Sequence, residues 1–214
     1  MPWLRSGVNK FIPSVITQPI PQVKKTLMSL AKGAAIIDVG AGGRKIADRV
    51  ICIDAVSLPN TDIVADIGSL PLRNDSQDCV FCTGVLEHIE NPGPALKEFR
   101  RIMKPNGIVH IEVPFLQPYH KDPQDYWRWT LEGLRLFARQ HGFREIRSGA
   151  LIGPASAMNA MIIAYFQSWF RNRYIRKLID ILLSFMLFPF KFFDLFLLDQ
   201  NPDILSAVYY VGKK

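Results

Sequence analysis

Short apolar runs alternate with amphipathic stretches along most of this chain. Residues 36–39, 50–53 and 108–113 are rich in branched apolar side chains, and each run has the length of a buried strand. Residues 94–104 carry apolar side chains at helical spacing, and Pro-Asn-Gly at 105–107 marks the end of that helix. Strands that alternate with helices predict an α/β fold with a doubly wound, mostly parallel sheet and helices on both of its faces.

Further strands follow from the same pattern. Residues 61–66 and 79–83 are expected to form the third and fourth strands, and residues 144–152 and 205–211 the sixth and the last. A chain of 214 residues is long enough to bury one sizeable core. We therefore expect a single domain over residues 1–214.

The pattern changes between residues 155 and 200, where we expect a helical, apolar insertion within the domain. Its uncharged run, residues 181–190, is too short for a membrane-spanning helix of about 20 apolar residues. Cations and phenylalanines side by side are typical of a surface at the membrane headgroups. Residues 171–198 therefore predict either a peripheral membrane contact or a lid or subunit contact that buries the phenylalanines. The cations that precede the apolar run are Arg171, Arg173, Arg176 and Lys177.

A glycine-rich turn directly follows the first strand, because residues 36–43 read Ile-Ile-Asp-Val-Gly-Ala-Gly-Gly. Glycines at such a turn let the backbone approach a bound nucleotide closely, and Asp54 ends the next strand. A dinucleotide-binding loop would have a third glycine where Lys45 stands, and no Gly-Lys-Ser/Thr of a phosphate-binding loop follows. The pattern favours a nucleoside ligand and disfavours NAD. Residues 23–31 predict an amphipathic helix that is a lid or flank of this site.

The motif Asp38-x-Gly40-x-Gly42, followed by Asp54, resembles the first two motifs of class I methyltransferases that depend on S-adenosylmethionine (SAM). One position departs from the family pattern, since Arg44 stands where these enzymes usually have a third glycine.

Two later segments extend the resemblance. Residues 66–72 resemble the family's D-x-x-x-L-P-F/L segment, and residues 101–107 resemble its R-V-L-K-P-G-G segment. The likeness covers about residues 34–150, with the segments in the family's order, and is greatest to the methyltransferase type 11 domain.

This resemblance implies an enzyme of class EC 2.1.1 that transfers a methyl group from SAM. It implies that the glycine loop lies under the methionine part of SAM, and that Asp54 accepts both ribose hydroxyls. Asp66 would bond the adenine amine, while Ile67 packs on the ring. The residues expected to bind SAM are Asp38, Gly40, Ala41, Gly42, Asp54, Ala55, Asp66, Ile67, Gly84 and Leu86.

Residues 114–130 concentrate aromatic and titratable side chains where the ligands of open α/β sheets bind. His120 is the first candidate for a general base, because the unperturbed pKa of histidine lies nearest neutrality. Asp122 or Asp125 would orient it, His88 is a further catalytic candidate, and no metal is expected. The candidate substrate-binding residues are Tyr119, Asp122, Tyr126 and Arg128.

The same loop also has a structural interpretation. Tyr126, Trp127 and Trp129 could instead pin it to the core, and the sequence leaves both interpretations open. Thr130 is expected to cap a helix that ends at Gly142.

Residues 114–130 resemble a subgroup of these methyltransferases from bacterial cell-surface glycan pathways, which implies a small or lipid-linked acceptor and methylation of a sugar hydroxyl. A quinone or lipid acceptor is one alternative, and a SAM-fold protein that binds a partner without turnover is another. The net charge of +7 is spread over several segments, which disfavours a nucleic-acid substrate. The oligomeric state stays open.

Cysteine usage bears on the compartment. Cys52, Cys79 and Cys82 are expected to be buried small side chains of a reduced, cytoplasmic protein that could also lie at the inner face of the membrane.

Overall fold

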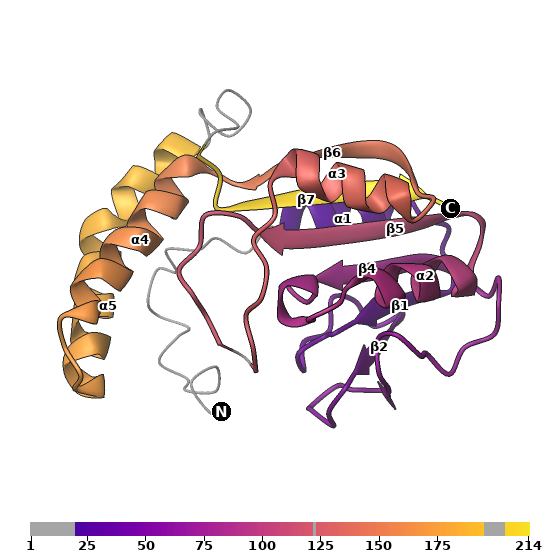
Figure 1. The fold of residues 1–214 in the computed structure, drawn as a ribbon, viewed down its shortest axis with the longest axis horizontal. Coiled ribbons are helices and arrows are strands. Elements are labelled where there is room, and N and C mark those ends of the chain that lie inside the picture. The colour runs from indigo at the N-terminus through magenta and orange to yellow at the C-terminus, as the bar shows by residue number, and fades with distance from the viewer. Residues whose placement is uncertain (1–19, 122, 195–203) are drawn as a thin grey trace. The chain divides into compact units, whose positions relative to one another are not determined.

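One seven-stranded sheet forms the centre of the fold, with strand order β3-β2-β1-β4-β5-β7-β6 (Figure 1). The structure is a computed structural model that describes residues 20–121, 123–194 and 204–214. The strands are β1 (Ile36–Val39), β2 (Val50–Asp54), β3 (Ile63–Val64), β4 (Gln77–Thr83), β5 (Met103–Pro114), β6 (Arg144–Ile152) and β7 (Ala207–Lys213). The helices are α1 (Ile20–Met28), η3 (Leu86–His88), α2 (Gly93–Ile102), α3 (Leu131–Gln140), α4 (Pro154–Ser168), α5 (Arg173–Leu187) and η4 (Phe188–Phe193).

The strands β1 to β5 pair in parallel, and β1 lies between β2 and β4. β7 runs antiparallel to β5, because the Leu116 amide donates to the Leu205 carbonyl at one end and the Lys214 amide to the Gly107 carbonyl at the other. In Figure 1, α2 and α3 lie in front of the sheet and α1 lies behind it. The mostly parallel α/β fold with helices on both faces is therefore confirmed.

Two differences from the expected elements have physical causes. β5 begins at Met103, where Gln77 pairs with it, so the strand takes up the Lys-Pro-Asn-Gly turn as an irregularity instead of starting after it. Asn106 adopts a φ of +64° in this turn, a conformation that asparagine tolerates better than most residues. α1 packs Val23 and Leu27 against a core that includes Ile36, the first residue of β1. It therefore covers the part of the sheet where strands begin, not the edge where they end.

Two compact units divide the chain. The sheet unit comprises residues 20–115, 119–149 and 208–214. The described part of the helical unit comprises residues 116–118, 150–194 and 204–207, so the ends of β6 and β7 belong to it. All three cysteines lie in the sheet unit and are completely buried, as expected.

The helical unit contains the expected insertion as the pair α4 and α5, followed by η4. Asp194 fixes the start of α4, because its carboxylate accepts the Ala155 amide at 2.7 Å and the Ser156 hydroxyl at 2.6 Å. Asn159 donates from α4 to the Leu187 carbonyl at the end of α5, at 3.0 Å. Among the described residues, no helix is both long and apolar enough to span a bilayer.

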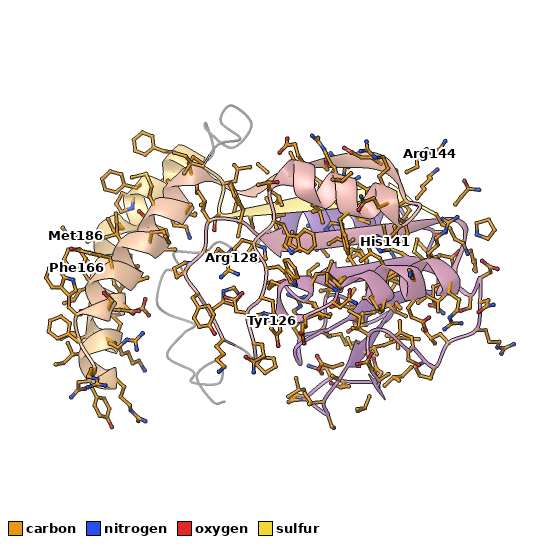
Figure 2. All side chains as sticks on the ribbon, viewed as in Figure 1. Tyr126, Arg128, His141, Arg144, Phe166 and Met186 are labelled. Atoms are coloured by element: carbon orange, nitrogen blue, oxygen red, sulfur yellow. The ribbon has the colours of Figure 1, made fainter. Side chains whose placement is uncertain are left out.

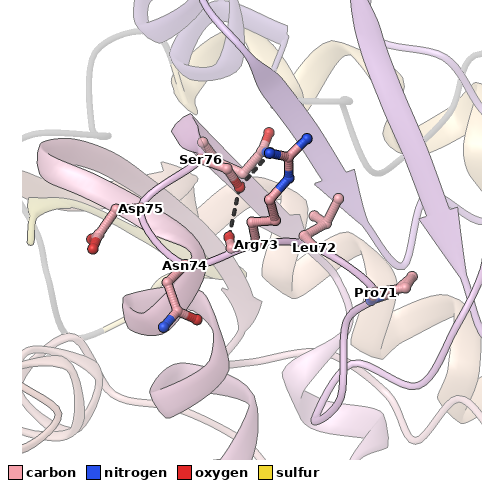
Figure 3. Close-up of a pocket in the computed structure, with 7 residues that line it drawn as sticks. Pro71, Leu72, Arg73, Asn74, Asp75 and Ser76 are labelled. Atoms are coloured by element: carbon pink, nitrogen blue, oxygen red, sulfur yellow. Dashed lines mark hydrogen bonds between the residues drawn. The ribbon is translucent and has the colours of Figure 1, made fainter.

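A hollow of about 460 Å³ lies beside the loop of residues 71–77 (Figure 3). This loop leads into β4, so the hollow lies at the amino end of that strand. Arg101 holds the loop by donating to the carbonyls of Leu72 and Leu70 at 2.9 and 3.1 Å. The ligand crevice of an open α/β sheet lies at the carboxyl ends of its strands. The hollow is therefore a feature of the opposite edge and not the candidate site.

Candidate functional site

The parallel register brings the ends of β1, β2 and β4 to one edge of the sheet, which we call the carboxyl edge. Gly40 and Gly42 follow β1 with φ of +73° and +61°, in the region that favours glycine. A Cβ at Gly40 would collide with the side chain of Val85, whereas a Cβ at Gly42 would meet no atom within 4 Å. The loop is therefore packed against protein on one side and open to an approaching ligand on the other.

Asp54 ties this loop to the end of β2. Its carboxylate accepts hydrogen bonds from the Gly42 amide at 2.8 Å and from the Val56 amide at 3.2 Å. Ala55, the residue directly after β2, is exposed. Asp66 is exposed further along the same edge and accepts the Gly68 amide at 2.7 Å. Asp54 and Asp66, the residues predicted to bind the ribose and the adenine, thus lie on neighbouring loops with carboxylate oxygens near the surface.

Asp38 is a buried carboxylate within β1. It is 0% exposed, and neither of its oxygens has a hydrogen-bond partner. Burial raises its pKa to about 6, while Arg44, whose Nε lies 3.8 Å from the carboxylate, opposes that rise. The Arg44 guanidinium also donates to the carbonyl of Thr83 at 3.0 Å and to its hydroxyl. The residue in place of the family's third glycine therefore crosses the ligand loop and joins β1 to the end of β4.

The loop after β5 is fixed to the end of β4 through backbone contacts. The Tyr126 amide donates to the Glu87 carbonyl at 2.7 Å, and the Trp127 indole donates to the Ile89 carbonyl at 2.9 Å. Trp129 packs on Phe137 of α3 with ring centroids 5.0 Å apart. The two tryptophans therefore pin the loop, as the structural interpretation expects.

Aromatic groups of the same loop remain open to solvent. Tyr119 is 69% exposed and Tyr126 is 49% exposed, and Tyr126 is labelled in Figure 2. Thr130 caps α3 as predicted, because its hydroxyl accepts the Gly133 amide at 3.0 Å. The side chains of Tyr119 and Tyr126 are free to line an acceptor site, but Asp122 lies outside the described residues.

Two histidines from distant positions meet at the carboxyl edge. The rings of His88 and His120 have centroids 5.2 Å apart and are nearly perpendicular, at 88°. The Nε2 atom of each ring lies 3.9 Å from the same oxygen, Oε1 of Glu87. The two catalytic candidates thus share a carboxylate that the sequence interpretation did not select.

Asp125 and Arg128 hold His120 from the other side. The Asp125 carboxylate accepts the His120 backbone amide at 2.8 Å and forms a two-bond ion pair with Arg128, one bond of which measures 2.6 Å. This pairing with Arg128 lowers the pKa of Asp125 to about 2. His120 Nδ1 lies 3.6 Å from Asp125 and 3.4 Å from Arg128 Nη2. Arg128 therefore positions Asp125, and its expected role in substrate binding stays a prediction.

Glu87 is the residue that sequence reasoning missed. It follows β4, is 2% exposed, and its Oε2 has no hydrogen-bond partner. Burial raises the pKa of this carboxyl above its usual value. Its position in the sequence could have identified it, because Glu87 directly precedes His88 and follows β4, whose neighbouring strand β1 leads into the glycine loop.

The other expected cofactor residues are placed as follows. Gly84 is exposed with a φ of +69°, and Ile67 is half-buried. Leu86 points into the core with 0% exposure, so only its backbone is near the edge. A further buried network, outside the expected set, joins His110 to Glu112 at 2.8 Å and to Thr26 at 2.9 Å.

The sequence around the glycine loop is similar to that of known proteins. The model of a family described as "Methyltransferase domain" matches residues 37–111. An uncharacterized 37.1 kDa protein in transposon TN4556 of Streptomyces fradiae is 31% identical over 96 residues, 44% of this chain and 26% of that protein. A tRNA U34 carboxymethyltransferase of Campylobacter jejuni is 24% identical over 90 residues, 37% of this chain and 31% of that protein. The chain therefore spans less than a third of the length of these curated relatives.

A solved structure with the same architecture covers nearly the whole chain. The 1,6-didemethyltoxoflavin-N1-methyltransferase of Burkholderia thailandensis, with bound 1,6-didemethyltoxoflavin and S-adenosylhomocysteine, has a TM-score of 0.60 at 14% identity. The likeness covers 97% of this chain and 81% of that one. The chain has the fold of the class I methyltransferases. The carboxyl edge of this fold carries both the glycine loop and the His88–His120 pair.

Asp38 makes the stability of this protein depend on pH. The pKa of the Asp38 carboxyl is about 6 in the folded protein and 3.8 in its ordinary state. The protonated carboxyl therefore stabilises the fold fully below pH 3.8, and this contribution is lost as the pH rises through 6. Asp38→Asn does not titrate. We expect the stability of the wild type relative to Asp38→Asn to fall by about 2 kcal/mol between pH 4 and 7, at about 1.4 kcal/mol per pKa unit. Urea unfolding at several pH values measures this difference.

The exposed Asp48 supplies the control for this measurement. Asp48→Asn should keep a nearly constant difference from the wild type over the same pH range. An equally flat difference for Asp38→Asn would contradict the raised pKa.

Proposed function

We propose that this protein is a SAM-dependent methyltransferase that acts on a hydroxyl group of a small or lipid-linked acceptor. The observation that carries the proposal is the glycine loop, which is open above Gly42 and flanked by the carboxylates of Asp54 and Asp38. The solved relative with bound S-adenosylhomocysteine supports the choice of cofactor.

The residues present fit SAM. The unpartnered, buried oxygens of Asp38 offer acceptors for a cationic donor, and SAM carries an ammonium group and a sulfonium. Asp54 and Asp66 would accept from the ribose hydroxyls and the adenine amine, with Ile67 against the ring. When bound, SAM supplies a methyl group on a positively charged sulfur, which a nucleophile displaces. This chain's part is to hold the acceptor in line with that methyl group, which can lower the barrier by roughly 7–11 kcal/mol.

The acceptor would bind beside Glu87, His88 and His120. These groups can take up a hydroxyl proton, and the exposed rings of Tyr119 and Tyr126 supply apolar surface for an acceptor on the same loop. A sugar hydroxyl of a cell-surface glycan precursor matches this combination of aromatic faces and a proton-accepting cluster. A quinone or lipid acceptor is the second candidate, favoured by the apolar helical unit described next.

The helical unit supports a peripheral membrane contact. Along α5, exposed apolar side chains recur at helical spacing, from Leu178 and Leu182 to Phe185, which are 55%, 58% and 56% exposed. The side chains of Phe166 and Met186 also lie on the surface of this unit (Figure 2). Four exposed cations lie at and just before the start of α5, namely Arg171, Arg173, Arg176 and Lys177. We propose that this surface binds anionic lipid at the cytoplasmic face of a membrane, which would bring a lipid-linked acceptor to the enzyme.

A binding experiment tests the cofactor assignment. Asp54→Ala should weaken SAM binding by about 10- to 150-fold, since loss of a charged hydrogen-bond acceptor costs about 1.5–3 kcal/mol. Titration calorimetry measures the affinity, and Asp48→Ala at an exposed position should leave it unchanged. Unchanged affinity in a folded Asp54→Ala protein would remove Asp54 from the site. Tighter binding of NAD than of SAM would overturn the proposed activity.

The chemistry is tested by turnover with labelled SAM and a set of sugar, quinone and lipid acceptors. His120→Ala should lower kcat by about 10²-fold or more and leave SAM affinity unchanged, because His120 lies on the acceptor side. His141→Ala, which changes a histidine at the end of α3, should keep full activity. Full activity of His120→Ala would contradict the catalytic assignment, and no methylation of any acceptor would favour a protein that binds without turnover.

The membrane contact is tested by sedimentation with vesicles. Each cation near an anionic surface contributes about 1 kcal/mol, so the protein should pellet with phosphatidylglycerol vesicles at low salt and less at high salt. Replacing Phe188 and Phe192 together with Ser should release it, whereas Leu136→Ser, at an exposed apolar position on α3, should not. Protein that stays in the supernatant at low salt would favour a lid or subunit contact.

A further inference from the structure

A cluster of metal-ligating atoms lies at the carboxyl edge, although the sequence led us to expect no metal. Glu87, His88 and His120 each offer one ligand atom, and these atoms lie within 4.8 Å of one another. We propose that Glu87, His88 and His120 bind a divalent transition-metal ion such as Zn²⁺.

The spacing of the three ligand atoms is close to that of a metal site. Each Nε2 lies 3.9 Å from Glu87 Oε1. Ligands at about 2.0–2.1 Å from a tetrahedral zinc ion are separated by roughly 3.3 Å, so each Nε2 needs to approach Oε1 by about 0.6 Å, and no two of the three atoms need to approach by more than about 1.5 Å. His88 and Glu87 lie within or beside the short helix η3, and His120 comes from the loop held by Asp125. Small rotations of these side chains are enough to close the site.

The hydrogen bonds of the two rings orient the ligand atoms. His88 Nδ1 faces the carbonyl of Gln124, which can only accept, so Nδ1 carries the proton and Nε2 presents its lone pair. His120 Nδ1 lies 3.6 Å from the Asp125 carboxylate, toward which a metal-bound ring would turn its Nδ1–H and away from Arg128. Metal-binding histidines almost always donate their second ring nitrogen to a carbonyl or carboxylate. His88 has such an outer partner, whereas His120 Nδ1 accepts from Arg128 Nη2 in this structure and would gain its partner by turning toward Asp125.

Glu87 provides a second, independent observation. Its side chain is nine-tenths or more buried, and its Oε2 lacks any hydrogen-bond partner. A buried carboxylate oxygen without a partner loses its hydration and gains nothing in return, which costs more than for a neutral group. A cation bound between Glu87 and the two imidazoles would compensate this cost.

The ligand set selects the class of ion. Two imidazoles suit Zn²⁺ and other late first-row ions, whereas Mg²⁺ and Ca²⁺ prefer oxygen ligands. Three protein ligands leave a fourth position open, as in catalytic zinc sites. If the proposed methyl transfer to a hydroxyl is correct, an ion there would favour the ionised form of that hydroxyl. His120 would then act in the reaction as a ligand of the ion, in place of the general base of the metal-free site.

Metal binding is measured directly on the full chain, with any affinity tag removed and without SAM. Titration of Zn²⁺ in competition with a chromophoric chelator should give one ion per chain for the wild type, and Mg²⁺ at the same concentration should not compete. Glu87→Gln and His120→Gln should each weaken binding by more than about 100-fold, beyond the loss expected from an outer partner. The control variant His141→Gln should bind Zn²⁺ as tightly as the wild type does. Co²⁺ bound to the wild type in place of Zn²⁺ should give the visible absorption spectrum of a tetrahedral site.

Two variants keep the test decisive. If Glu87→Gln does not fold, His120→Gln still answers, because His120 is 35% exposed and its loss leaves the core intact. Absence of stoichiometric Zn²⁺ binding to the wild type, or equal binding to His120→Gln, would overturn the proposal. Stoichiometric Zn²⁺ binding without methyl transfer would support the metal site and contradict the proposed activity, whereas methyl transfer by a protein that binds no Zn²⁺ would support the activity and overturn the metal site.

Discussion

The parallel pairing of β1 between β2 and β4 is the constraint on which the rest of the structure depends. Ile36 lies opposite both Val50 and Cys79, so the three strands start and end nearly together. The Gly40 amide donates to the Ile53 carbonyl at 2.8 Å, which turns the chain back at the end of β1. Because all three strands run the same way, the residues that follow them meet at one edge, although they lie as far apart in the sequence as Gly40 and Gly84.

That edge concentrates negative charge in a poorly hydrated place. Asp38, Glu87 and Glu112 are buried at or near it, and Glu112 contributes to the raised pKa of Asp38. Arg44 is the nearest cation to Asp38 and also ties down Thr83. Burying carboxylates without full compensation lowers stability, and such residues are commonly found where a ligand or substrate supplies the missing partner. The arrangement is easier to understand as a binding surface than as a structural core.

Much of the sheet unit could be predicted because its signals are local. The sixth strand was expected over residues 144–152 and observed as β6 over the same residues, and the α3 cap at Thr130 was read from a single side chain. The start of β5 was missed because the Lys-Pro-Asn-Gly turn reads as a stop, while pairing with Gln77 extends the strand through it. The position of α1 could not be read from periodicity, since an amphipathic pattern does not say which part of the sheet it covers.

The acceptor side shows the limit more clearly. His88 and Glu87 follow β4, whereas His120 lies in a loop more than 30 residues later, and no spacing rule relates them. Their meeting depends on backbone bonds from Tyr126 and Trp127 to the Glu87 carbonyl, and on Asp125 holding the His120 amide. These are tertiary contacts, and the local sequence around each residue does not predict them. Sequence analysis could nominate His88 and His120 separately, but only the fold could join them through Glu87.

The two halves of the site are therefore built in different ways, and this difference bears on function. The proposed cofactor half is fixed by strand register and by glycine conformations, so a substitution there affects the fold as well as ligand binding. The proposed acceptor half is carried by a loop that is attached at a few points and keeps exposed aromatic rings, so its chemistry can vary while the sheet stays the same. For this reason the substrate depends on the loop of residues 114–130 and its partners, and not on the sheet whose architecture the chain shares with class I methyltransferases.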